Sequence, residues 1–416
     1  MAIVTDAASP ARPSDSGLRA RVASSPLIDY YLVIFTVAIL CAIGALMVLS
    51  ASGVIAQVQA SSPYSYAIRQ LTFLALGSIA AIVLTRLPVD LIRRSSWLAW
   101  GFAVVALGLV LSPLGHHYNG NTNWLSIAGI TFQPSEFAKL ALILWGAAVL
   151  HVKRKQLKQP MQLLVPFIPG TGVLLALILA GRDLGTGIVV AMIILALLFF
   201  VGTAWRLLVP ILLAGVGVVL FLLFGSSNRM DRVQIFLDPQ VNTDLSSQPM
   251  AGLYALASGG WWGLGLGASK QKWGGLKDGA HTDYIFAVVG EELGLFGVVV
   301  VLVMFALLAK AGFSIAMQSD QLFNQLVASG ITAWILIQGI INIMVVMHLL
   351  PVIGVPLPFA STTARPQAVF PATRACSTSP AGRCARSGCC RAWAATISAT
   401  AARTLTSWTA RPSSSR

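Results

Sequence analysis

All three glutamates of this 416-residue chain, Glu136, Glu291 and Glu292, lie inside or at the edge of long apolar stretches. A carboxylate is costly to keep in such surroundings, so an acid retained there is by default a functional hypothesis. Asp283 lies just upstream of the last two, where a long polar loop meets a strongly hydrophobic run. The pattern predicts three carboxylates, Asp283, Glu291 and Glu292, at one entrance to an apolar layer.

Asp283 is the acid best placed for proton transfer, because apolar Ile285 and Phe286 follow it directly. Partial loss of water makes a carboxylate at a membrane boundary a stronger base, which suits general-base catalysis. The alternative is that Asp283 caps the helix that begins after it. Glu291 and Glu292 lie about 12 Å deeper along that helix. Because adjacent helical positions point in different directions, we expect one to face a cavity and the other to need a helix partner.

Two further acids lie at predicted helix starts. Pro134 and Ser135 are favoured helix-starting residues, and the helix dipole favours Glu136 in the first turn. Glu136 and Lys139, three residues apart, either set the electrostatics of a substrate cavity or form a plain neutralising pair. Asp183, in the short turn at 181–186, is likewise either a substrate-binding acid or a turn-forming one.

Segment 225–283 is far longer than a connection between two spans requires, and long loops are often functional. Its cations Arg232, Lys270 and Lys272 are candidates for neutralising a phosphate, with contact to lipid headgroups as the alternative. The tryptophans of this segment fit an interfacial aromatic belt. In another loop His116 and His117 are adjacent, and metal binding or simple solvent exposure would each explain them.

The elements that position these residues follow from composition. Residues are 56% hydrophobic and 10% charged, and the mean hydropathy is +0.79, which indicates a polytopic membrane protein. About 20 apolar residues cross a bilayer, and continuous apolar runs predict helices, so the fold class is all-α. The predicted spans are 28–52, 67–85, 96–112, 135–151, 161–180, 184–201, 205–224, 284–309 and 322–348.

Loop charges predict the orientation. Arg86, Arg93 and Arg94 follow the second span and Lys153 follows the fourth, whereas loops 53–66 and 113–134 contain no Lys or Arg. The positive-inside rule therefore places the amino terminus in the cytoplasm and the 225–283 loop outside.

The predicted domain organisation has three parts. Residues 1–26 form a cytosolic disordered tail, residues 27–361 a transmembrane domain, and residues 362–416 a low-complexity disordered tail that resembles an out-of-frame reading. That tail has eight Arg and no Asp or Glu, so it supplies eight of the net +14 charges. A nucleic-acid partner is therefore not indicated by the net charge.

Five short motifs together resemble the SEDS family (shape, elongation, division and sporulation), and more its FtsW branch than its RodA branch. They cover residues 132–139, 183–186, 271–273, 281–286 and 290–294. The resemblance extends over about residues 28–361. It implies a ten-span helix bundle in the bacterial cytoplasmic membrane, at the division septum, that polymerises lipid II into peptidoglycan strands. It also implies a class B penicillin-binding protein and other division proteins as partners.

In this hypothesis Asp283 deprotonates an acceptor sugar hydroxyl, a polyprenyl pyrophosphate leaves, and the anomeric carbon inverts. His281 and Thr282 join the cations and acids named above as substrate-binding residues. No cofactor is certain; a divalent cation such as Mg²⁺ or Mn²⁺ would offset the charge of the leaving group. Two alternatives stay open, namely a flippase for lipid II and a division scaffold without catalytic activity.

The chain departs from the family pattern at two places. Family members usually read Leu-Pro-Glu-Ala-His-Thr-Asp, whereas residues 276–283 here lack the Pro and shift the acidic residue. After Ser361 the family continues into a Gly- and Ser-rich turn and a tenth helix, which residues 362–416 do not match. An inactive product is therefore one expectation for the chain as written.

Overall fold

The computed structural model describes residues 26–58, 65–113, 115–118, 121–127, 130–153, 160–225, 227–240, 243–273, 275–276, 279–280 and 282–359. All of these residues belong to one unit, which lies within residues 1–365. The predictions for 1–25 and 362–416, for the tenth helix and for His281 lie outside the described residues.

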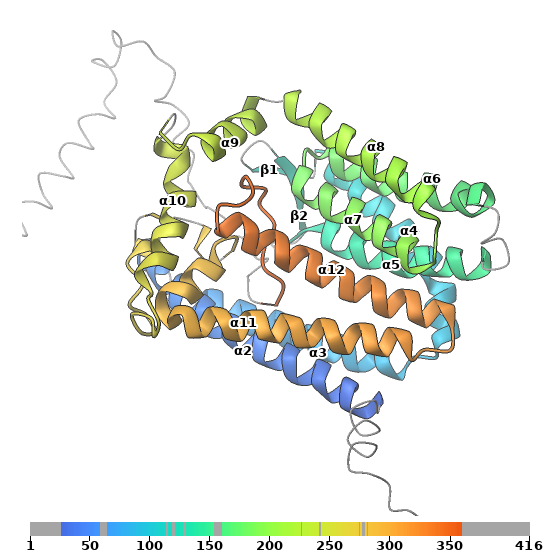
Figure 1. The fold of residues 1–416 in the computed structure, drawn as a ribbon, viewed down its shortest axis with the longest axis horizontal. Helices are drawn as coiled ribbons and strands as arrows, with labels where there is room; N and C mark the ends of the chain where they lie inside the picture. The colour runs from blue at the N-terminus through green and yellow to red at the C-terminus, as the bar shows by residue number, and fades with distance from the viewer. Residues whose placement is uncertain are drawn as a thin grey trace, which may run out of the picture. The chain divides into compact units, whose positions relative to one another are not determined.

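The described chain is a bundle of helices, which confirms the predicted all-α class (Figure 1). Every one of the nine predicted spans corresponds to a helix. These helices are α2 (Pro26–Val58), α3 (Ser65–Arg86), α4 (Val89–Val110), α5 (Pro134–Val152), α6 (Pro160–Ala180), α7 (Leu184–Phe200), α8 (Trp205–Phe224), α11 (Ile285–Met317) and α12 (Leu322–Val346).

Six of these helices, α2, α3, α5, α8, α11 and α12, are long and apolar enough to cross a membrane, and α6 and α7 contain shorter apolar stretches. Helices are the form in which a chain satisfies its own backbone groups in lipid. α4 begins seven residues before the predicted span at 96, so Arg93 and Arg94 are helical rather than in a loop. Charges in a first turn lower the apparent hydropathy and hide the start of such a helix.

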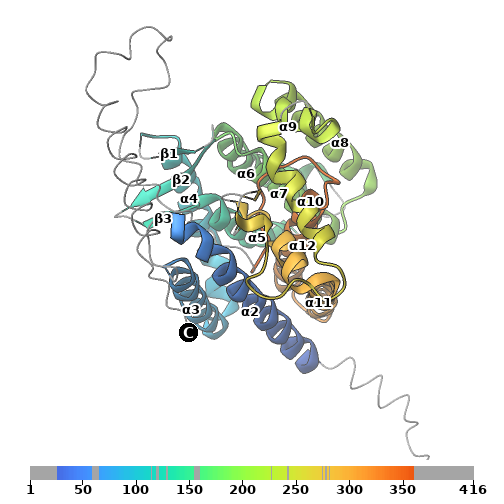
Figure 2. The same cartoon turned by 90° about the vertical axis from the view of Figure 1, so that its left-hand side faces the viewer.

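The long loop is more structured than its sequence indicates. It contains α9 (Ser227–Leu237), α10 (Thr243–Ser258) and the short 3-10 helix η2 (Gln271–Trp273). Helices α9 and α10 gather at the end of the bundle where α11 begins (Figures 1 and 2). Loop 113–134 adds a small antiparallel sheet of β1 (Gly115–Tyr118), β2 (Asn121–Ile127) and β3 (Ile130–Phe132), in the order β1-β2-β3. The sheet was not predicted.

Two hydrophobic cores meet along α12. One is built mainly from α4, α5, α6 and α7, and the other from α2, α10 and α11. α12 contributes Phe323 and Leu326 to the first core and Val346 to the second. Residues 351–359, which form neither helix nor strand, also contribute to both cores, through Val355 and Leu357. Polar groups on α12 and on segment 351–359 therefore lie between two packed halves.

Helix α11 is interrupted at Gly294, where φ is 65° and ψ is −162°. Only glycine readily adopts this backbone conformation. The loop after α10 fills the break by backbone hydrogen bonds of 2.9 to 3.3 Å. The bonds run from Leu264 N to Glu291 O, from Gly265 N to Glu292 O, from Leu295 N to Gly260 O, and from Phe296 N to Trp261 O. The freed backbone groups are thus satisfied by protein, as membrane depth requires.

Replacing Gly294 by Ala is expected to destabilise this junction. The backbone conformation alone costs a residue with a side chain about 1–3 kcal/mol, and a Cβ at this position would lie 2.3 Å from Gly263 N. We expect a lower midpoint of thermal unfolding in detergent. Gly215→Ala in α8 is the control, since a Cβ there meets nothing within 4 Å. Equal midpoints for both variants would contradict the role given to Gly294.

Candidate active site

Asp283 lies one residue before Tyr284, the N-cap residue of α11. Its backbone carbonyl accepts a hydrogen bond of 2.8 Å from Asn342 Nδ2, and the same amide donates to Val355 O at 2.8 Å. The Asp283 carboxylate faces segment 351–359, because a Cβ on Gly354 would lie 3.8 Å from Asp283 Oδ2. The half-buried acid is therefore held between α12 and this segment, at the end of the bundle that carries α9 and α10.

Tyr284 is a neighbour of Asp283 that sequence reasoning left without a role. Its ring is buried between Gly252 of α10 and Gly279, each of which would clash with it if it carried a Cβ. Burial raises the pKa of the Tyr284 phenol, the negative charge of Asp283 raises it further, and Arg232 opposes the shift. Among the described residues Tyr284 Oη has no hydrogen-bond partner. A neutral phenol with a spare donor thus lies beside the acid.

Arg232 on α9 is exposed and donates a hydrogen bond of 3.2 Å to Val352 O, in the segment that Asp283 faces. The structure adds Arg182 and Arg229, which sequence reasoning did not assign to the site. Arg229 donates to Leu222 O at 2.9 Å and to Arg182 O at 3.1 Å. Burial lowers the pKa of Arg229, and the nearby charges of Arg182 and Arg232 lower it further. The three side chains form an arginine cluster.

Lys139 and Glu136 form the predicted pair. Lys139 Nζ lies 2.8 Å from both carboxylate oxygens of Glu136 and 2.8 Å from Gln338 Oε1. The lysine is 1% exposed and lies 5.2 Å from the centre of the Trp334 ring. Gln338 also donates to Pro356 O at 3.1 Å. Lys139 is therefore joined through α12 to the segment against which Asp283 lies.

Asp183 caps α7. Its carboxylate accepts hydrogen bonds from Thr186 N at 3.1 Å and Thr186 Oγ1 at 2.9 Å. Asn123 and Gln133 donate two more, at 2.9 and 3.2 Å. With four protein donors and 7% exposure, this geometry favours the turn-forming alternative over contact with a substrate. Asp183 fixes the α6–α7 turn to the loop that carries the sheet.

Glu291 and Glu292 are both buried and both have protein partners. Glu291 accepts hydrogen bonds from Ser269 Oγ and from Lys270 N, the latter at 2.8 Å. Glu292 binds Lys272 Nζ at 2.9 Å and Ser50 Oγ at 2.6 Å. The expectation that one acid faces a cavity is therefore wrong in this structure, because both hold the loop that enters the α11 break.

Of the remaining predicted substrate-binding residues, Lys272 and Thr282 are buried and bonded to protein, whereas the Lys270 side chain is exposed. Lys272 is 4% exposed and bound to Glu292, so in this structure a phosphate would have to compete with a buried carboxylate for it. Lys270 has an exposed side chain, while its backbone N–H is bound to Glu291. Thr282 is buried, and its backbone N–H donates to Gly279 O at 3.2 Å.

Metal ligands are not assembled within the described part of the chain, where no group of three or more His, Cys, Asp and Glu side chains occurs. His116 and His117 lie in β1. At Asp283 a divalent ion would have the Asp283 carboxylate as a ligand. Mg²⁺ is commonly bound in this manner, through one or two carboxylates, substrate phosphates and water. The residues present thus fit a substrate-delivered Mg²⁺ or Mn²⁺, which stays a prediction.

The family model of cell cycle proteins FtsW, RodA and SpoVE matches residues 30–363. A probable peptidoglycan glycosyltransferase FtsW of Mycobacterium tuberculosis is 38% identical over 81% of this chain and 64% of its own length. One from Trichlorobacter lovleyi is 33% identical over 80% and 88%. Stage V sporulation protein E of Bacillus subtilis is 36% identical over 80% and 90%. The chain thus spans less than two thirds of the mycobacterial relative.

Solved structures agree with the fold. The polypeptide from a peptidoglycan synthase complex superposes with a TM-score of 0.60 at 27% identity, over 79% of this chain and 90% of that one. Rod shape determining protein RodA of Thermus thermophilus gives a TM-score of 0.55 at 26% identity, over 79% and 88%. Together with the family match over 30–363, these similarities show that the chain belongs to the FtsW/RodA/SpoVE family of polytopic membrane proteins.

Proposed function

We propose that this chain is a peptidoglycan glycosyltransferase that polymerises lipid II. The relatives named as such enzymes support the reaction. The observation that carries the proposal is a half-buried carboxylate, Asp283, anchored through its backbone between α12 and segment 351–359 and adjacent to an arginine cluster. A base at this end of the bundle can accept the proton of the acceptor hydroxyl, and the cations can neutralise the negative charge of the leaving pyrophosphate.

The reaction assigns a separate task to each group. Asp283 takes the proton of an acceptor sugar hydroxyl, and the freed oxygen bonds to the anomeric carbon of the donor. The bond from that carbon to the pyrophosphate oxygen breaks with inversion, so the proton ends on Asp283 and the negative charge on the leaving pyrophosphate. The Tyr284 phenol stays neutral at ordinary pH, and its buried ring packs beside the acid.

The arginine cluster is proposed to bind the pyrophosphate. Guanidinium groups bind phosphate oxygens in a bidentate manner and remain charged even when crowded. Burial lowers the pKa of Arg229, the charges of Arg182 and Arg232 lower it further, and Asp183 opposes the shift, so positive charge is concentrated here. A dianionic leaving group would compensate that charge. Arg232 thereby keeps its predicted role, and Arg182 and Arg229 take the role first given to Lys272.

Location and partners complete the proposal. The positive-inside pattern supports a cytoplasmic amino terminus, which puts Asp283 and the arginine cluster on the outer side. There the enzyme would work at the division septum of the bacterial cytoplasmic membrane. A class B penicillin-binding protein would crosslink the strands it makes, beside other division proteins. A solved relative belongs to a peptidoglycan synthase complex that coordinates polymerization and crosslinking.

Purified chain supplied with lipid II tests the activity. Glycan polymer that lengthens with time supports the proposal. Vesicles containing the chain and labelled lipid II provide the second measurement, which is movement of lipid II between leaflets. Translocation without polymer would favour the flippase alternative. Neither polymer nor translocation, with binding of division proteins retained, would favour the scaffold.

Arg232→Gln is expected to reduce kcat/KM for lipid II by about 10- to 100-fold, the equivalent of one charge-assisted hydrogen bond. Arg232→Lys should recover part of the loss, because the charge returns without the bidentate geometry. The control is Arg206→Gln, an exposed cation in the first turn of α8. Initial rates against lipid II concentration give both constants. A loss no larger than that of the control would remove Arg232 from the pyrophosphate site.

A further inference from the structure

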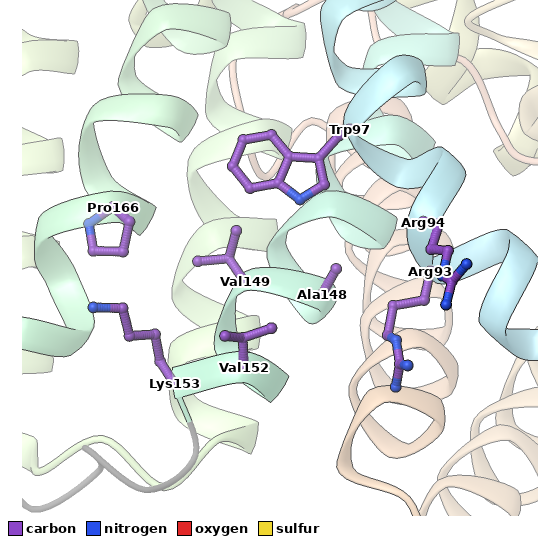
Figure 3. A pocket seen from close by; sticks show the side chains of 8 residues that line it. All are labelled: Arg93, Arg94, Trp97, Ala148, Val149, Val152, Lys153 and Pro166. Atoms are coloured by element: carbon purple, nitrogen blue, oxygen red, sulfur yellow. The ribbon is translucent and has the colours of Figure 1, made fainter.

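A pocket lies at the opposite end of the bundle from Asp283. It is a cavity of about 300 Å³ between the start of α4, the end of α5 and the first turns of α6 (Figure 3). Lys139, which is linked through Gln338 to the segment that Asp283 faces, lies near the start of α5. The cavity is lined by Arg93, Arg94, Trp97, Ala148, Val149, Val152, Lys153 and Pro166.

Three cations surround this cavity. In Figure 3 Arg93 and Arg94 lie on one side of the α5 residues, and Lys153 lies on the other, near Pro166. Arg93 is partly neutralised, with its guanidinium 2.8 Å from Asp90 Oδ1 and 3.4 Å from His151 Nε2. Within the described ranges, Arg94 and Lys153 have no recorded hydrogen bond or ion pair. Two positive charges thus remain available for an anion.

The rest of the lining is apolar, and part of it is exposed. Trp97 is 56% exposed and Val152 is 75% exposed, as expected for side chains that face lipid. Behind them the wall is rigid. Trp145 stacks on Trp100 with ring centres 5.4 Å apart, and Trp100 Nε1 donates to Gly170 O at 3.2 Å. The cavity is therefore formed by packing among α4, α5 and α6 and does not depend on a ligand.

We propose that this pocket binds the phosphate of an anionic phospholipid. Arg94 and Lys153, assisted by Arg93, bind the phosphate oxygens, and Trp97, Val149 and Val152 contact the glycerol and the upper acyl chain. Basic pockets between transmembrane helices on the cytoplasmic side suit anionic headgroups. A free phosphate ion would leave the apolar half of the lining unused, which is why a lipid is the occupant. The proposal does not depend on the activity at Asp283.

The test is native mass spectrometry of the full chain in detergent, titrated with phosphatidylglycerol or with phosphatidylcholine of the same acyl chains. We expect the unsubstituted chain to bind phosphatidylglycerol more tightly. Arg94→Gln with Lys153→Gln should weaken it about 30-fold, from the contribution expected of two interfacial cations. Arg94→Lys with Lys153→Arg should restore binding. The matched control is Arg206→Gln with Lys310→Gln, which removes two exposed cations elsewhere.

Val152→Glu provides an independent variant at an exposed position, where folding should be least affected, and it should weaken phosphatidylglycerol through repulsion at the mouth of the cavity. Equal affinity for the two lipids would overturn the proposal. So would equal losses in the pocket and control variants when both keep the unfolding midpoint of the unsubstituted chain. Displacement of phosphatidylglycerol by millimolar inorganic phosphate as readily as by lipid would show a free-phosphate site and would also overturn it.

Discussion

Asp283→Asn is expected to slow glycan polymerisation by purified chain by about 10²- to 10⁴-fold, the usual contribution of a positioned general base. The substitution is nearly isosteric. The bond from Asn342 goes to the backbone carbonyl of Asp283, so the amide variant retains that anchor and loses the basic oxygen. The measurement is the initial rate of polymer formation from lipid II at saturating concentration, where the loss should appear in kcat.

Asp238→Asn is the matched control for this experiment. Asp238 follows α9 in the same long loop, is exposed, and accepts a hydrogen bond from Gln240 N at 3.0 Å. Its replacement should leave the rate within about twofold, as expected for a surface change away from special features. Full polymerisation by Asp283→Asn, with an unchanged unfolding midpoint, would exclude the proposed proton transfer.

Glu292→Gln is expected to cause the largest loss of stability. It removes the partner of Lys272 and leaves an ammonium group that is 4% exposed. Breaking a buried ion pair from one side costs about 3–5 kcal/mol. The loop that fills the α11 break should loosen with it, because Lys272 also donates to Gly267 O at 2.7 Å. Thermal unfolding in detergent and proteolysis of the loop measure the two effects.

Two further variants serve as references for the stability loss of Glu292→Gln. Asp90→Asn breaks the pair with Arg93, in which the Asp90 side chain is 74% exposed, so it should cost no more than about 1 kcal/mol. Combining Lys272→Met with Glu292→Leu should recover much of the loss, since apolar replacements leave no buried charge. If Glu292→Gln lowers the midpoint no more than Asp90→Asn does, the buried pair is not what holds the loop.

The helices could be predicted from the sequence because lipid imposes a single requirement, about 20 apolar residues per span. The predictions failed where that requirement does not act. Arg93 and Arg94 lie in helix α4, upstream of the predicted start of its span at residue 96, and the β1-β2-β3 sheet lies in a polar loop. The break at Gly294 could not be predicted from the sequence either, because glycines are common in transmembrane helices. What distinguishes Gly294 is its backbone contact with the loop after α10.

Individual residues of the candidate site could be predicted from the sequence, but the contacts between them could not. Asp283 and the Glu136–Lys139 pair follow from local sequence, and the pair is confirmed by the distances. Lys272 was assigned to a phosphate because its partners, Glu292 and Ser50, lie 20 and 222 residues away. Arg182 and Arg229 were not assigned to the site from the sequence. Their clustering with Arg232 depends on how α9 packs, which no local pattern encodes.

Segment 351–359 holds hydrogen bonds from three side chains on two separate helices. Arg232 of α9 donates to Val352 O, and Asn342 and Gln338 of α12 donate to Val355 O and Pro356 O. These acceptors are main-chain carbonyls within a stretch of five residues. Asn342 also donates a hydrogen bond to the backbone carbonyl of Asp283. A displacement of α9 would therefore be transmitted to the peptide of Asp283 through segment 351–359 and Asn342.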